Sequence, residues 1–213
     1  MPRPIVIAHH LIWTVYGTWL PNDPRGSGSR AIACDVLRDL GDVHYGRKRV
    51  QPSDAVIRAF YAQATPLLKH EVRMIDAAVV AHAFEQTIEQ RRYTCYACAI
   101  MPDHVHLLIR KHRDTAETMI EALKSDSVAA CIAAGTHPPG HPVWVGGLGW
   151  KVFLEHPDEV QRTIRYIEAN PTKARMSAQR WPFVQSYDRW PLHPGHSLNS
   201  PYVKALRAAG RYP

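Results

Sequence analysis

Two histidines separated by a single residue stand in the segment "MPDHVHLLIR", residues 101–110. Alternate side chains of an extended strand point to the same face, so His104 and His106 would lie side by side while the apolar residues between and after them face a core. Two imidazoles on one strand face can supply half of a metal site. The same pattern also fits two ordinary histidines on a half-exposed sheet, because one such pair alone is weak evidence.

A second set of reactive side chains falls in "RTIRYIEANPTK", residues 162–173. Tyr166 and Asn170 are four residues apart and Arg162 is one turn earlier, so a helix would present all three on one face. A phenol can act as a nucleophile, and a carboxamide oxygen can act as a metal ligand. Both residues also have structural interpretations: Tyr166 as an amphipathic core residue, and Asn170, which precedes Pro171, as the cap of a following turn.

The elements that must position these residues alternate along the chain. Strand-like segments are rich in β-branched and aromatic residues, whereas helical segments repeat apolar residues every three or four positions. We expect strands within 5–20, 93–101, 104–111 and 143–155, and helices over 52–64, 76–92, 114–134 and 156–170. A Pro102–Asp103 turn would join the second and third strands into a hairpin. This order predicts an α+β fold, with one antiparallel sheet and helices packed on one face.

Length and composition favour one globular domain over residues 1–213. Hydrophobic residues make up 46% of the chain and charged residues 21%, which is typical of a packed core and not of a disordered chain. The polar residues 31–51 are interpreted as an insertion. Residues 177–213, rich in proline, tryptophan and arginine, predict an irregular tail.

The chain is basic, with a formal net charge of +7 and a pI near 9.4. This excess favours a polyanionic partner such as nucleic acid, although surplus lysine and arginine also occur as solvated surface. No apolar run approaches a membrane span, and the start of the chain is too polar for a secretory signal, so we expect a cytoplasmic protein with no membrane partner. The four cysteines are then expected to be reduced, with the thiols of Cys95 and Cys98 on opposite sides of their strand.

The two reactive segments together resemble a known signature. "PDHVHLL" followed by "RYIEANP" is similar to the pattern of single-tyrosine HUH transposases (histidine, hydrophobic, histidine), and in particular to the REP-associated tyrosine transposase branch. The blocks "HHLIWTVYGTWLPNDPRGS", "ALKSDSVA" and "RWPFV" also resemble that branch, so the resemblance extends in separated blocks from Ile5 to Val184. It implies a ferredoxin- or RRM-like HUH fold.

The resemblance also implies roles for individual residues. His104 and His106 match the metal-binding pair, Tyr166 matches the nucleophile and Asn170 matches the third ligand. The implied activity is that of a transposase and single-strand DNA endonuclease, which cleaves and rejoins DNA at palindromic hairpins through a 5′-phosphotyrosine intermediate. The implied cofactor is a divalent metal, Mg²⁺ or Mn²⁺. The polar stretch 31–51 and the glycine-split "VGGLGWKV" depart from the pattern of the family.

Basic residues near the matched positions are the expected contacts to a single-stranded DNA hairpin. They are Arg162, Arg165, Lys173, Lys124 and Arg25. Trp13, Trp19 and Trp144 could stack on bases or belong to the core. The protein would act as a monomer or a homodimer, with the tyrosine helix serving its own site or the partner's. Two alternatives stay open: a DNA-hairpin-binding protein without turnover, and a metal-dependent hydrolase that uses His104 and His106.

Overall fold

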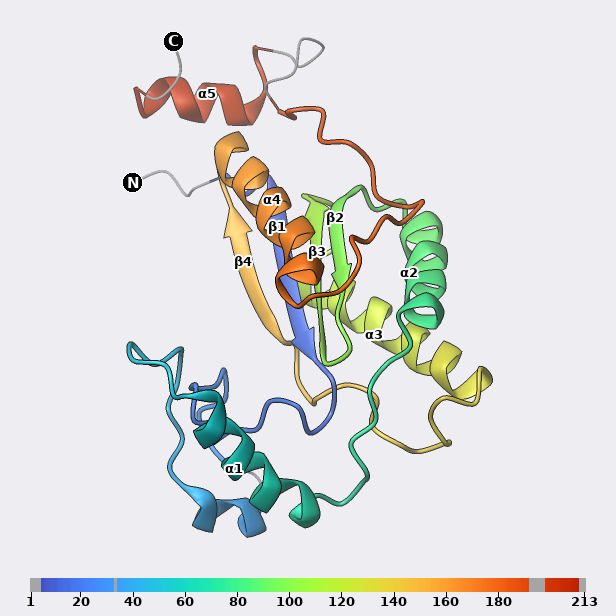
Figure 1. The fold of residues 1–213 in the computed structure, drawn as a ribbon. Coiled ribbons are helices and arrows are strands. Elements are labelled where there is room, and N and C mark those ends of the chain that lie inside the picture. Colours follow the sequence, from blue (N-terminus) through green and yellow to red (C-terminus); the bar gives the residue numbers. More distant parts are fainter. Residues whose placement is uncertain (1–4, 33, 192–197, 211–213) are drawn as a thin grey trace.

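The computed structural model describes residues 5–32, 34–191 and 198–210. Its centre is a four-stranded antiparallel sheet in the order β2-β3-β1-β4 (Figure 1). The strands are β1 (Ala8–Thr14), β2 (Cys95–Ile100), β3 (His104–Arg110) and β4 (Trp150–Leu154). The predicted α+β class and antiparallel sheet are therefore confirmed.

A tight turn joins β2 to β3, as predicted. The Met101 amide donates a hydrogen bond to the His104 carbonyl at 2.8 Å and closes the hairpin. The carbonyl of Asp103, in the turn, accepts a hydrogen bond from the Val15 amide at 2.7 Å, just beyond the end of β1. The turn that precedes the histidine pair is thus tied to the neighbouring strand, which fixes where β3 begins.

Helices α2 (Ala77–Arg91) and α3 (Ala116–Ala133) pack together on one face of the sheet. The Asp76 side chain caps α2 by accepting hydrogen bonds from the Ala78 and Val79 amides. The Thr115 side chain caps α3 by accepting a hydrogen bond from the Thr118 amide. Beneath them lies the main hydrophobic core, whose largest buried members include Trp13, Phe84, Leu107, Met119 and Ile120. The strand side chains in this core alternate with those of the opposite face.

Helix α4 (Pro157–Lys173) covers the other face of the sheet (Figure 1). A second hydrophobic cluster there joins Val160 and Ile167 of α4 to Leu108 of β3. The prediction that the helices pack on one face of the sheet therefore holds for α2 and α3, whereas α4 packs on the other face. Hydrophobic periodicity identifies the buried stripe of a helix and does not say which face of a sheet that stripe covers.

The ends of α4 follow from local chemistry. His156 caps the helix, and the Glu159 side chain completes a capping box. The helix continues past Asn170 to Lys173 with Pro171 inside its last turn, so the interpretation of Asn170 as a cap is wrong. The predicted irregular tail 177–213 also differs from the structure, because it contains helix α5 (Pro201–Ala208), which starts at the Ser200 cap and packs in the same cluster as α4.

The segment between β1 and α2 forms a small body at one end of the sheet (Figure 1). It contains the 3-10 helix η1 (Asp35–Leu40), helix α1 (Asp54–Ala64) and the 3-10 turn η2 (Thr65–Leu67). Leu20, Leu37 and Phe60 pack together in its own hydrophobic cluster. The described part of the polar stretch 31–51 belongs to this body and not to the sheet.

The two cysteines of β2 lie in the same hydrophobic cluster, which corrects the expectation that their thiols face opposite sides. The reason is a register shift between Cys95 and Ala97, a β-bulge that reverses the alternation of the strand. Both thiols are buried, and burial raises the pKa of Cys95 to about 12. In the ranges that the structure describes, no helix is long and apolar enough to cross a membrane.

Candidate active site

His104 and His106 lie side by side on the face of β3 that α4 covers. Their ring centroids are 5.0 Å apart and the two ring planes are nearly perpendicular. His106 is buried, whereas the His104 side chain stays partly exposed. Val105, Leu107 and Ile109 point into the main core on the opposite face, so the alternation of β3 itself sets the pair on one side.

Each of the two imidazoles is held through its Nδ1 atom. The Asp103 carboxylate lies 2.7 Å from Nδ1 of His104, and Nε2 of His10 lies 2.9 Å from Nδ1 of His106. Both rings therefore keep Nε2 as the nitrogen that can bind a ligand. Outer partners of this kind are the usual way in which proteins fix the tautomer and orientation of metal-binding histidines.

His10 is a site residue that sequence reasoning missed. It lies on β1, and its neighbour on the same strand face, Ile12, pairs directly with His106. The alternation of "AHHLIWT" puts His10 and Ile12 on one face, which was a usable signal. The pairing of β1 with β3 brings residues 10 and 106 together, and the local pattern of neither strand predicts that pairing.

Burial sets the protonation of these histidines. Desolvation lowers the pKa of His10 to about 4. Desolvation, with the charges of His104 and His10, lowers the pKa of His106 to about 3. Burial alone would raise the pKa of Asp103, but the hydrogen bond with His104 and the charge of Arg25 hold it below its usual range. Near neutral pH the imidazoles of His10 and His106 are therefore neutral and the Asp103 carboxylate is ionised. An imidazole must be neutral to bind a metal ion.

Tyr166 stands above this pair on α4. Its ring centroid is 5.6 Å from that of His106 and 6.1 Å from that of His10, all within one chain. The side chain is 48% exposed, whereas the next residue, Ile167, is fully buried and anchors the helix. The interpretation of Tyr166 as a core residue is therefore wrong. Its phenol is open to solvent directly beside the histidines.

Asn170 follows Tyr166 by one helical turn. Its Nδ2 atom is buried and has no hydrogen-bond partner among the described residues. Rotating the carboxamide by 180° would place the oxygen at the same position. An unpartnered buried amide on the Tyr166 stripe fits a ligand-binding role.

The donors at this site suit a metal that takes much of its coordination from the substrate. No group of three or more His, Cys, Asp or Glu side chains in the described ranges could by itself hold a metal ion. Two imidazole nitrogens and one amide oxygen would leave several positions for phosphate oxygens and water. Such a mixed set is compatible with Mg²⁺ or Mn²⁺. The residues present therefore fit the metal that the sequence motif implies.

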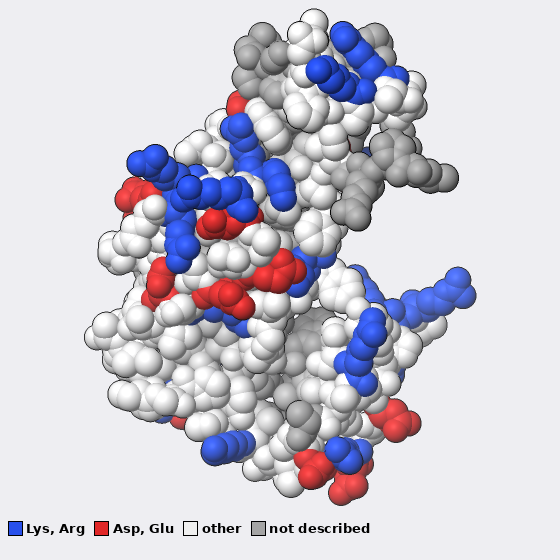
Figure 2. Space-filling model, turned by 180° about the vertical axis from the view of Figure 1, so that it is seen from behind, with Lys and Arg blue, Asp and Glu red and all other residues white. Residues whose placement is uncertain are grey.

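An open pocket of about 430 Å³ lies against the tyrosine. Arg162, Thr163 and Tyr166 of α4 form one side, and His10 and Val152 of the sheet form another. Arg165 is exposed on the same helix, and the Lys173 ammonium lies 5.4 Å from the centroid of the Tyr166 ring. The opposite face of the molecule, behind α4, carries acidic and basic side chains next to one another (Figure 2).

Lys124 and Arg25 are placed differently from the basic residues of α4. Lys124 lies on α3, on the other face of the sheet, and its ammonium donates to the Val145 and Gly147 carbonyls at 2.7 and 2.8 Å. Desolvation lowers its pKa to about 8. It lines a separate hollow of about 340 Å³ that contains none of the site residues. The Lys124 ammonium therefore holds the loop after α3 in place through these two hydrogen bonds.

Arg25 is paired within the loop after β1. Its guanidinium donates to both carboxylate oxygens of Asp23 at 2.9 and 2.7 Å and lies 3.8 Å above the ring centroid of Trp19. This pairing engages the Nε and Nη2 donors of Arg25, so a phosphate would have to share the guanidinium with Asp23. The charge of Arg25 also helps to hold the pKa of Asp103 below its usual range.

Comparisons with known proteins gave structural similarities only. No protein family and no curated protein matches the chain. A solved REP-associated tyrosine transposase bound to a REP hairpin is similar at 14% identity, with a TM-score of 0.43 over 100% of this chain and 87% of that one. A protein of Deinococcus radiodurans R1, provisionally assigned as a transposase, is similar at 16% identity, with a TM-score of 0.37 over 84% of this chain and 97% of that one. Because both scores are below 0.5, function has to be argued from the site.

Proposed function

We propose that the protein is a metal-dependent transposase and single-strand DNA endonuclease, which cleaves and rejoins DNA at palindromic hairpins through a 5′-phosphotyrosine intermediate. The observation that carries the proposal is the half-exposed ring of Tyr166, 5.6 Å from the ring of His106 within one chain. The hairpin substrate comes from the resemblance of the two sequence segments to REP-associated transposases.

The covalent step would use the phenol of Tyr166. Its oxygen would attack the scissile phosphorus as the phenol gives up its proton, and the bond from phosphorus to the 3′ oxygen would break. The departing 3′ oxygen would take up a proton and become a free 3′ hydroxyl. Because a phenol is more acidic than an aliphatic alcohol, it is both a usable nucleophile and a good leaving group. The reverse attack by a 3′ hydroxyl would rejoin DNA without ATP, because one phosphodiester is exchanged for another.

The surrounding residues would hold and orient the reacting groups. His104, His106 and Asn170 would bind the divalent ion, which when bound polarises the phosphate. Asp103 and His10 would keep the two imidazoles in the ligating orientation. Arg162 and Lys173 would contact the phosphates on either side, because both flank the open phenol of Tyr166.

A metal-dependent hydrolase has less support at this site, because hydrolysis needs a general base to activate water. Glu159 is the acidic residue that lines the pocket. Its Oε2 atom already accepts the Glu155 and His156 amides, at 2.9 and 3.2 Å, in the capping box of α4. That carboxylate is therefore engaged in holding the helix.

Denaturing gels of labelled single-stranded hairpin DNA, run with Mg²⁺ or Mn²⁺, would test the proposal. The parent should form a slow-migrating covalent adduct, while Tyr166→Phe should bind the hairpin without cleaving it. His104→Ala and His106→Ala should abolish metal-dependent cleavage with the fold retained. Tyr202→Phe on α5 is the matched control and should cleave like the parent, because the Tyr202 hydroxyl has no hydrogen-bond partner among the described residues. Hairpin binding by a parent that never forms an adduct would instead indicate a binding protein without turnover.

A further inference from the structure

A half-exposed tryptophan stands on the same side of the sheet as the proposed site. Trp150, the first residue of β4, is 47% exposed. Trp13 and Trp144, by contrast, are buried in the main core, and Trp19 is covered by Arg25. A large aromatic ring left in water on a folded domain is a candidate contact for a partner.

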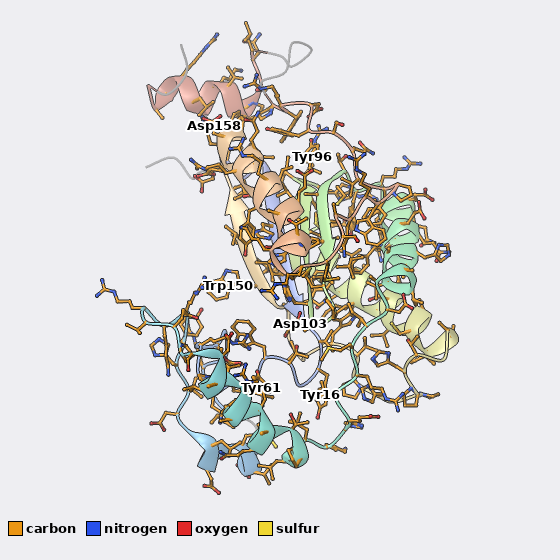
Figure 3. All side chains as sticks on the ribbon, viewed as in Figure 1. Tyr16, Tyr61, Tyr96, Asp103, Trp150 and Asp158 are labelled. Carbon is orange, nitrogen blue, oxygen red and sulfur yellow. The ribbon has the colours of Figure 1, made fainter. Side chains whose placement is uncertain are left out.

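The strand register places Trp150 in line with the histidine pair. Ile12 of β1 pairs with His106 on one side and with Trp150 on the other. Directly paired residues share a sheet face, so Trp150 is on the face of His106 and Tyr166. Two strand spacings separate Trp150 from His106 across the sheet, a distance of about 10 Å. Figure 3 shows Trp150 and Asp103 at the same end of the sheet, the end nearest α1.

The position of Trp150 is fixed by the residue before it. Gly149 has a φ of 63°, and a Cβ atom there would overlap the Ile12 carbonyl oxygen. Only glycine allows this close approach of β4 to β1. The backbone that carries Trp150 is thereby held against the central strand, so little ordering is needed when a ligand binds.

A second aromatic residue and an arginine extend the surface from Trp150. The Tyr45 ring is 51% exposed, and its centroid is 6.4 Å from that of Trp150. The Arg30 guanidinium lies 4.9 Å from the Tyr45 centroid. Backbone hydrogen bonds of 2.8 Å join Ser27 to His44 and Gly46, which brings these two loops together. No carboxylate of the described residues forms a salt bridge with Arg30, in contrast to Arg25.

We propose that Trp150, extended by Tyr45 and Arg30, is a stacking platform for unpaired bases of the DNA strand next to the cleaved phosphate. This inference rests on the proposed function, because it takes the pocket of Tyr166 as the place of that phosphate. Aromatic faces bind any base by stacking, and an arginine beside them can bind the backbone. The positive charge of the chain and the continuity with the site favour a nucleic-acid strand as the occupant.

The test measures binding of a fluorescein-labelled DNA hairpin with single-stranded flanks, and of the same hairpin with abasic flanks, by fluorescence anisotropy. Trp150→Ala should weaken binding of the normal flank about 5- to 150-fold, which corresponds to about 1–3 kcal/mol. Trp150→Tyr, which keeps an aromatic face, should restore most of the affinity. Phe153→Ala is the matched control, because Phe153 is 49% exposed on the same strand but packs against His9 on the other face.

The abasic flank separates stacking from a general structural effect. The parent should lose affinity when the flank loses its bases, whereas Trp150→Ala should bind both hairpins equally. The proposal would be overturned if the parent and Trp150→Ala bound the normal flank equally. It would also be overturned if the affinity lost through Trp150→Ala and the affinity lost through removal of the bases were simply additive. A parent that binds neither hairpin would overturn it as well. Trp150-dependent binding without any cleavage would support the platform and contradict the endonuclease, so the two failures are distinguishable.

Discussion

Replacing His10 by phenylalanine should weaken metal binding although His10 is not a proposed ligand. His10→Phe keeps the ring and fills the site, but it removes the nitrogen 2.9 Å from Nδ1 of His106. Loss of such an outer partner typically reduces metal affinity about 10- to 100-fold, or about 1.4–2.7 kcal/mol. His106 is 5% exposed, so its unpartnered Nδ1 should also lower the free energy of unfolding by about 1–3 kcal/mol.

The assay measures hairpin cleavage against the Mn²⁺ concentration, with unfolding by urea measured in parallel. The concentration of Mn²⁺ needed for half-maximal cleavage should rise about 10- to 100-fold in His10→Phe, with cleavage recovering at high metal. His9→Phe is the matched control, because His9 is the adjacent residue and points to the other sheet face. Both ring nitrogens of His9 are buried and have no hydrogen-bond partner in the part of the chain that the structure describes, so that variant should be at least as stable as the parent.

The reasoning about His10 would be refuted by equal metal dependence in the parent, His10→Phe and His9→Phe. It would also be refuted if His9→Phe raised the metal requirement as much as His10→Phe does, because the effect would then come from disturbing β1 in general. A drop in stability of His10→Phe with an unchanged metal requirement would leave His10 as a packing residue only.

Three further predictions follow from the same contacts. The free energy of unfolding should fall as the pH drops from about 6.5 to about 4, because burial lowers the pKa of His9 and of His10 to about 4 and the unfolded chain takes up protons first. Each of the two histidines contributes about 3 kcal/mol. Urea unfolding measured over this pH range tests the prediction, and a flat profile would contradict it. Lys124→Met should lower the free energy of unfolding by about 1–3 kcal/mol, because the Val145 and Gly147 carbonyls lose their donor. The hairpin affinity of this variant, measured by anisotropy, should equal that of the parent. A large loss of affinity with normal stability would instead indicate that Lys124 contacts DNA. Arg162→Ala should slow cleavage and reduce the salt dependence of hairpin binding more than Arg207→Ala on α5 does. Equal effects of the two substitutions would show that Arg162 has no particular role in binding the DNA.

Much of the fold could be predicted because its signals are local. The alternation of residues 104–110 predicts a strand with two histidines on one face, and the Pro102–Asp103 turn predicts the hairpin with β2. Helix α4 is predicted by its apolar spacing, and the structure adds that His156 caps its start. The face that α4 covers was not predictable in this way, because it depends on which strand neighbours which and not on the periodicity of the helix.

The rest of the site depends on contacts between distant parts of the chain. His10 reaches His106 across 96 residues, and only the pairing of β1 with β3 makes them partners. Arg25 looks available in the sequence, but the folded loop pairs it with Asp23. In the same way, composition cannot tell Trp150, which stays in water, from Trp13, which is buried. Local pattern gives the type of a side chain, whereas its availability is a property of the packing.

The most direct test of the central claim is to map the residue to which DNA becomes attached. The parent protein would be incubated with a single-stranded hairpin and Mn²⁺, the adduct digested with protease, and the nucleotide-bearing peptide sequenced by mass spectrometry. We predict a 5′-phosphate on Tyr166, together with an upstream DNA fragment that ends in a free 3′ hydroxyl. Attachment to another residue, or a 3′-linked phosphate, would contradict it.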